Sequence, residues 1–147
     1  MIYKEVKGDL FTAPIDNILV HCISADHAMG AGIAKRFTEM GIKTAIGGSK
    51  DAWNGIGYAV ITKIKSCPWM VCNLVTKEKY WMKPTYKTLK QALEELKIGV
   101  TGLRDYNKIA MPQIGCGLDK LKWSKVSTII QEMFTDTDVE ITVYIKE

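Results

Sequence analysis

The chain of 147 residues is long enough for one domain of ordinary size, and 47% hydrophobic with 24% charged residues is the composition of a globular protein. The net charge of +4 is compatible with an anionic ligand, but without a base-reading motif it gives only weak support to a nucleic-acid-binding protein. No apolar run approaches the roughly 20 residues that a membrane-spanning helix needs. We therefore expect a single globular domain over residues 1–147.

The first third of the chain predicts two strands and a helix. Residues 2–8 alternate apolar and polar side chains, as a strand with one buried face does. Residues 17–24 (NILVHCIS) are almost all apolar, which is typical of a strand covered on both faces. Residues 28–41 (AMGAGIAKRFTEMG) carry apolar side chains at helical spacing after two glycines, and Gly41 is expected to end this helix.

The middle of the chain predicts a hairpin and a long helix. Residues 57–64 and 69–77 are rich in β-branched side chains and are joined by a short segment containing Pro68, so they are expected to pair as a β-hairpin. Residues 83–100 place leucine and alanine at helical spacing, and Pro84 suits the first turn of that helix.

The last third predicts a strand, a helix and a final strand. Residues 107–114 read as a buried strand, and residues 123–134 as a helix whose N-cap is expected at Ser124 or just before it. Residues 139–147 show strand alternation. Strands that alternate with helices, without linker or repeat, predict an α/β domain with a mostly parallel, two-sided sheet. Ligands of such sheets bind beyond the carboxyl ends of the strands.

Two glycine-rich segments follow buried strands at that edge: SADHAMGAGIA (24–34) and GCGLD (115–119). Backbone amides in such turns can bind phosphate. Neither segment matches the P-loop pattern or the dinucleotide-binding pattern. From spacing alone, two interpretations are equally open: a ligand with more than one phosphate, or tight corners between strand and helix.

Several polar residues near these segments have an ordinary structural explanation beside a functional one. Lys77 ends a strand and could be a solvated lysine, with a nucleophile or phosphate contact as the minority interpretation. Asp119 could cap or precede the next helix, and Asp9 could be a turn residue. His21, inside an apolar strand, favours a hydrogen-bonded core histidine, and Ser24 a cap or loop hydroxyl.

The four cysteines form no CxxC pair, and only two histidines could join them as metal ligands. They lie in apolar surroundings. This pattern favours buried, reduced thiols over a disulfide or a metal site. The cysteines are Cys22, Cys67, Cys72 and Cys116.

Taken together, the segments VKGDLF, VHCIS, MGAGIAKRF, LVTK, KPTYKTLKQAL, MPQIGCGLDKLKW and ITVYI resemble, in this order, a macrodomain. The similarity covers essentially the whole chain. It is to the branch that holds the terminal ADP-ribose protein glycohydrolases and the antitoxin macrodomains that reverse DNA ADP-ribosylation. The resemblance implies a three-layer α/β/α sandwich with a mixed, mostly parallel central sheet and a cleft for ADP-ribose.

The resemblance also implies site residues. Lys77 and Asp119 match the catalytic pair of this branch. Asp9 would accept the adenine amino group with Leu10 beside it, and His21 and Ser24 would lie near the distal ribose, the ribose whose C1″ is modified. The further ADP-ribose contacts implied, among them a diphosphate-lining loop and a turn offering backbone N–H groups to phosphate, are Gly30, Ala31, Gly32, Ile33, Thr76, Pro112, Ile114, Gly115, Cys116, Gly117, Leu118 and Tyr144.

The implied function is that of an ADP-ribosyl hydrolase acting on glutamate or aspartate esters, O-acetyl-ADP-ribose or modified nucleobases. It needs no cofactor and no metal, and nucleic acid enters only as a modified substrate. A non-catalytic ADP-ribose reader and an ADP-ribose 1″-phosphate phosphatase are the alternatives. We expect a monomer in the cytoplasm, or also the nucleus if the protein is eukaryotic. The segment 78–83 (EKYWMK) departs from the family pattern and is expected to border the cleft.

Overall fold

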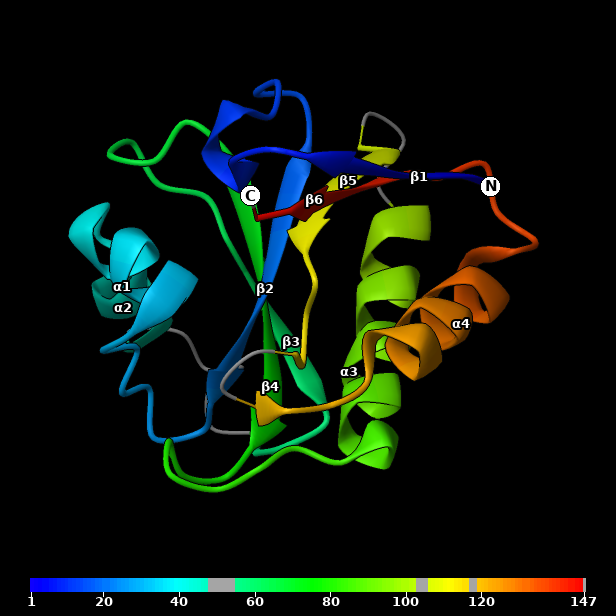
Figure 1. Ribbon diagram of the computed structural model, residues 1–147. Coiled ribbons are helices and arrows are strands. Elements are labelled where there is room, and N and C mark those ends of the chain that lie inside the picture. The colour runs from blue at the N-terminus through cyan, green and yellow to red at the C-terminus, as the bar shows by residue number, and fades with distance from the viewer. Residues whose placement is uncertain (48–54, 103–105, 117–118, 147) are drawn as a thin grey trace.

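The computed structural model describes residues 1–47, 55–102, 106–116 and 119–146. Its centre is a six-stranded sheet with the order β1-β6-β5-β2-β4-β3 (Figure 1). Neighbouring strands are parallel except β3 and β4, which pair antiparallel as the predicted hairpin. The strands are β1 (Ile2–Lys7), β2 (Ile18–Ser24), β3 (Tyr58–Thr62), β4 (Met70–Lys77), β5 (Lys108–Pro112) and β6 (Glu140–Ile145).

Helices cover both faces of this sheet, so the predicted three-layer α/β/α architecture is confirmed (Figure 1). On one face lie α1 (Gly32–Glu39) and α2 (Ile42–Gly47), and on the other α3 (Tyr86–Thr101) and α4 (Trp123–Phe134). Each face has its own apolar core. The side chains of β2 point alternately into the two cores, because successive residues of a strand face opposite ways.

One predicted helix start was wrong. Helix α3 begins at Tyr86, with Thr85 as its N-cap: the Thr85 side chain accepts from the Thr88 N–H, and the Thr88 hydroxyl accepts from the Thr85 N–H in a capping box. Pro84 therefore lies before the helix. The helix predicted over 123–134 is confirmed as α4; of the two expected cap positions, the one before Ser124 holds, because the N-cap is Lys122, which has no side-chain cap.

Two short elements were not predicted. A 3₁₀ turn, η1 (Leu10–Thr12), follows β1, and α2 follows Gly41, whose φ of +92° ends α1 as expected. Neither is long enough for sequence periodicity to reveal it. Within the described ranges, no helix is long and apolar enough to cross a membrane.

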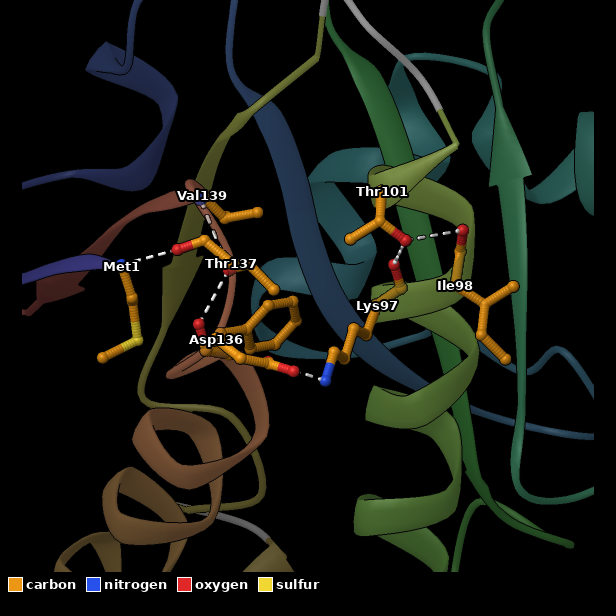
Figure 2. Close-up of polar contacts among 8 residues, drawn as sticks. Met1, Lys97, Ile98, Thr101, Asp136, Thr137 and Val139 are labelled. Atoms are coloured by element: carbon orange, nitrogen blue, oxygen red, sulfur yellow. Dashed lines mark hydrogen bonds and ion pairs between the residues drawn. The ribbon is translucent and has the colours of Figure 1, made fainter.

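The amino-terminal edge of the sheet is closed by polar contacts shown in Figure 2. The Met1 amino group donates to the Thr137 carbonyl at 2.6 Å, and Lys97 of α3 pairs with Asp136 at 3.0 Å. The opposite edge, where the parallel strands β2, β4 and β5 end, carries the loops that lead into the helices. This is the edge at which α/β sheets bind ligands.

Candidate active site

The last residue of β4 and a residue between β5 and α4 form an ion pair at this edge. Lys77 Nζ lies 2.6 Å from Asp119 Oδ1, and the two side chains are 14% and 15% exposed. The alternative that Lys77 is only a solvated lysine at the end of a strand is therefore wrong. Asp119 is not a helix cap either, since α4 begins after Lys122. A charge-assisted hydrogen bond this short, largely shielded from water, is also suited to passing a proton between its partners.

The pair lies on the wall of a cavity of about 640 Å³. This volume is in the range of small-molecule and cofactor sites. The wall is formed by the end of β2 with the loop into α1, by the end of β4 with the following loop, and by the turn after β5. Of the residues that the resemblance implies, those on the wall are His21, Ser24, Gly30, Ala31, Gly32, Ile33, Lys77, Pro112, Ile114, Gly115, Cys116 and Asp119.

Four implied residues are not part of this wall. Leu10 is buried in the apolar core on the face of the sheet covered by α1 and α2, and Tyr144 packs against that core. Thr76, the residue before Lys77 in β4, is buried. Asp9, half-exposed, lies outside the wall as well. Gly117 and Leu118 lie outside the described residues.

Asp9 is held by neighbours rather than standing free for a ligand. Its carboxylate accepts the Phe11 N–H at 2.9 Å, capping η1, and the Arg36 guanidinium at 2.9 and 3.0 Å. Arg36 also lies over the Phe11 ring, 3.8 Å from its centroid. The Phe11 N–H and then Arg36 hold the pKa of Asp9 below its usual range. Asp9 is therefore the turn residue that the sequence allowed. An adenine that bound to its carboxylate would have to share it with Arg36.

The two glycine-rich turns serve different structural needs. Gly32 has φ of +59°, and a Cβ there would meet nothing within 4 Å, so open cavity lies above it. Gly115 has φ of +73°, and a Cβ would lie 2.9 Å from Leu121 Cδ1. The Cys116 N–H donates to the Gln113 carbonyl at 3.3 Å, which closes the turn. The tight-corner interpretation therefore holds at Gly115, whereas Gly32 leaves room for a ligand.

The cysteines are all free, but they are not all buried. Cys67 and Cys72 are buried as expected, whereas Cys22 and Cys116 are half-buried on the cavity wall. Burial, and then the negative charge of Asp119, raises the pKa of Cys22 to about 12 and raises the pKa of Cys116. Both thiols therefore stay protonated, which makes them poor nucleophiles near neutral pH.

His21 is the hydrogen-bonded core histidine that the sequence favours. It is 2% exposed, and its Nε2 lies 2.5 Å from Asn73 Oδ1. The Asn73 amide donates to the Val60 carbonyl at 2.8 Å and to the Thr62 hydroxyl at 3.3 Å. These two contacts orient the amide so that its oxygen faces His21, and Nε2 must then carry the proton. Burial lowers the pKa of His21 to about 4, against the opposing effect of the Asn73 bond.

A pH-dependent stability follows from this histidine. Its pKa is about 4 in the folded protein and 6.5 unfolded, so the unfolded chain binds more protons between these values. We expect stability to be fully present above pH 6.5 and to fall by roughly 3 kcal/mol as the pH drops through 4. Urea unfolding between pH 4 and 7 measures this. In His21→Gln the amide can donate to Asn73 and does not titrate, so the loss of unfolding free energy between pH 7 and 4 should be smaller than in the wild type. An equal loss in the variant would contradict the role given to His21.

The loop 78–83 contributes two residues to the cavity wall. Tyr80 and Lys83 line the cavity, as expected for a segment bordering the cleft. Tyr80 and Trp81 are 63% and 65% exposed, with their rings edge to face at 5.2 Å. The only sequence signal for Tyr80 and Trp81 was the departure of EKYWMK from the family pattern.

No group of three or more His, Cys, Asp or Glu side chains that could hold a metal is found among the described residues.

Comparisons with known proteins agree with this geometry. No protein-family model matches the chain. It is 44% identical over 145 residues to ADP-ribose glycohydrolase OARD1 of Bos taurus and 43% identical to the Homo sapiens protein, covering 95% of this chain and 88% of each relative. Among solved structures, the macrodomain of Thermus aquaticus DarG has a TM-score of 0.83 at 26% identity and 97% coverage of both chains. Thermosipho africanus DarTG in complex with ADP-ribose has a TM-score of 0.82 at 19% identity, covering 96% of this chain and 40% of that one. The chain therefore belongs to the macrodomain family, in the branch of the terminal ADP-ribose glycohydrolases.

Proposed function

We propose that the protein binds ADP-ribose in the cavity and removes it hydrolytically from modified acceptors. The observation that carries the proposal is the shielded Lys77–Asp119 pair on the cavity wall, 2.6 Å apart, in a chain 43–44% identical to proteins named as ADP-ribose glycohydrolases. The acceptor classes are glutamate or aspartate esters, O-acetyl-ADP-ribose and modified nucleobases. We also propose that the protein works as a monomer in the cytoplasm.

In this proposal Lys77 is the nucleophile. Asp119 takes a proton from the ammonium, and the neutral Nζ attacks C1″ of the distal ribose. The N–C1″ bond forms as the bond from C1″ to the acceptor breaks, and the acceptor leaves with the electron pair, as a carboxylate in the ester case. Asp119 passes that proton to solvent, and the restored carboxylate deprotonates a water whose oxygen attacks C1″ of the adduct as the C1″–N bond breaks. The departing amine takes the proton back from Asp119, which regenerates the Lys77–Asp119 pair and releases ADP-ribose.

The surroundings of the pair favour Lys77 over other nucleophiles. Cys22 and Cys116 are the thiols on the wall, and their raised pKa values keep them protonated. The Ser24 hydroxyl donates to Asp26, so no base in the cavity is bonded to its proton. His21 donates to Asn73 and is buried beside Phe37, with ring centroids 4.2 Å apart. Lys77 is bonded to the Asp119 carboxylate, which lies on the same wall.

The proposal is tested with three substrates that differ in acceptor: glutamate-ADP-ribosylated protein, O-acetyl-ADP-ribose and thymidine-ADP-ribosylated DNA. Chromatography follows free ADP-ribose. Release from one or more identifies the hydrolase and its acceptor class. Binding of ADP-ribose by calorimetry without release from any substrate would instead support a reader module. Phosphate release from ADP-ribose 1″-phosphate would support the phosphatase.

Asp119→Asn is expected to lower kcat by roughly 10²- to 10⁴-fold, because an amide cannot take the proton of Lys77 or of water. The variant keeps the size of the side chain and one acceptor oxygen, so ADP-ribose affinity should change little. Steady-state rates and calorimetry together measure this. Equal loss of kcat and of ADP-ribose affinity would assign Asp119 to ligand binding rather than to proton transfer.

A further inference from the structure

The loops that follow β2 and β4 are joined by their backbones at the cavity. The Ala25 N–H donates to the Lys77 carbonyl at 2.8 Å, and the Asp26 N–H donates to the Glu78 carbonyl at 3.2 Å. A register shift between Ile23 and Ser24 brings Ser24 opposite Lys77. Such irregularities re-aim side chains at strand ends. The two loops appear together at the lower edge of the sheet in Figure 1.

The Asp26 carboxylate adds a side-chain bridge between the same two loops. Its Oδ1 accepts the Ser24 hydroxyl and the Ala28 N–H, the latter at 3.2 Å. Its Oδ2 accepts the Tyr80 N–H at 3.1 Å. One carboxylate therefore accepts three hydrogen bonds: one from the end of β2, one from the loop into α1 and one from the loop after Lys77. Asp26 is not itself on the cavity wall, whereas Ser24, Ala28 and Tyr80 are.

This bridge decides what Ser24 can offer to a ligand. A serine hydroxyl has one proton, and in Ser24 that proton is donated to Asp26. The oxygen of this 4% exposed residue therefore faces its surroundings as an acceptor only. On the other loop, the bond to the Tyr80 N–H fixes the backbone three residues beyond Lys77.

We propose that Asp26 is a positioning residue for the reaction: it fixes Ser24 as a hydrogen-bond acceptor and locks the loop after β4, and thereby holds Lys77 and the cavity wall in their working geometry. The inference rests on the proposed hydrolase function. Reacting groups displaced by about 1 Å can cost on the order of a hundredfold in rate. Asp26 acts through these neighbours and contacts no substrate, so its effect should appear in kcat rather than in ADP-ribose affinity.

The test uses Asp26→Asn in the full-length protein. The amide keeps the shape but replaces one accepting oxygen with a donor, so either the Tyr80 N–H or both the Ser24 hydroxyl and the Ala28 N–H lose their partner. We expect kcat to fall roughly 10- to 100-fold while the Kd for ADP-ribose, measured by calorimetry, is unchanged. Asp26→Ala, Ser24→Ala and their double variant form a cycle: the losses should be less than additive, because both substitutions remove the Ser24–Asp26 contact.

Asp136→Asn is the matched control. It also removes one carboxylate from a loop; its partner is Lys97 (Figure 2), and neither residue lines the cavity. Its kcat should equal that of the wild type. Unchanged kcat in folded Asp26→Asn overturns the inference, and so do additive losses in the cycle. A parallel loss of kcat and of ADP-ribose affinity would make Asp26 a ligand contact and would overturn it too.

A second measurement separates this inference from the proposed function. Amide hydrogen exchange at Tyr80 or at Ala28 should be faster in Asp26→Asn than in the wild type, because one of these two N–H groups loses its acceptor. Unchanged exchange at both overturns the inference even if the protein proves to be a hydrolase. If the wild type releases no ADP-ribose from any substrate, the proposed function fails, while the exchange result still decides whether Asp26 holds the two loops.

Discussion

Replacing Lys77 by alanine is expected to lower the rate of ADP-ribose release by roughly 10³- to 10⁶-fold, because removing a nucleophile leaves only binding and the remaining polar groups. ADP-ribose should still bind, since the cavity wall is otherwise intact. Single-turnover kinetics and calorimetry measure the two quantities. The variant also leaves Asp119 without its cation in a site that is largely shielded from water, so a lower melting temperature is expected.

Lys79→Ala is the matched control for Lys77→Ala, because it removes the same charge two residues further along from an exposed position outside the cavity wall. Its activity should be close to that of the wild type. The N–C1″ adduct can open its ribose ring to an imine at C1″, so borohydride reduction of that imine during turnover should fix ADP-ribose on Lys77 in the wild type and not in Lys77→Ala. A Lys77→Ala variant with wild-type rate, or a trapped adduct on another residue, contradicts the nucleophile assignment.

Replacing Phe37 by alanine is expected to cost about 3–5 kcal/mol of unfolding free energy, the usual range for truncating a fully buried phenylalanine. Its side chain is 0% exposed and packs against the His21 ring at 4.2 Å and the Phe11 ring at 5.0 Å between centroids. Because α1 begins in the loop that lines the cavity, its loosening should also weaken ADP-ribose binding. Urea unfolding and calorimetry measure both effects.

Phe134→Ala separates the two effects of Phe37→Ala. Phe134 is also 0% exposed, but it lies in α4, in the core on the other face of the sheet. We expect a similar loss of stability with ADP-ribose affinity unchanged. Phe37→Leu, which keeps most of the apolar volume, should fold even if the alanine variant does not. Equal ADP-ribose affinities in folded Phe37→Leu, Phe134→Ala and wild type would show that α1 packing does not shape the site.

The secondary structure was predicted well where a long periodic pattern was available. The apolar run of β2 and the leucine spacing of α3 identify both elements, because burial on both faces of a strand or one face of a helix leaves a repeating signature. Short elements leave none: α2 was missed, and Pro84 was placed inside α3 although the capping box of Thr85 and Thr88 begins that helix. Resemblance to a known family, rather than periodicity, pointed to Lys77 and Asp119.

The sequence by itself therefore determined the order of strands and helices, the α/β class and the family. The tertiary structure decided which residues meet. Lys77 and Asp119 are 42 positions apart, and Asp26 and Tyr80 are 54 apart; each pair comes together because parallel strands end at the same edge of the sheet. No local pattern encodes such contacts. Their geometry follows from the packing of whole elements, and local propensity acts only over a few neighbouring residues.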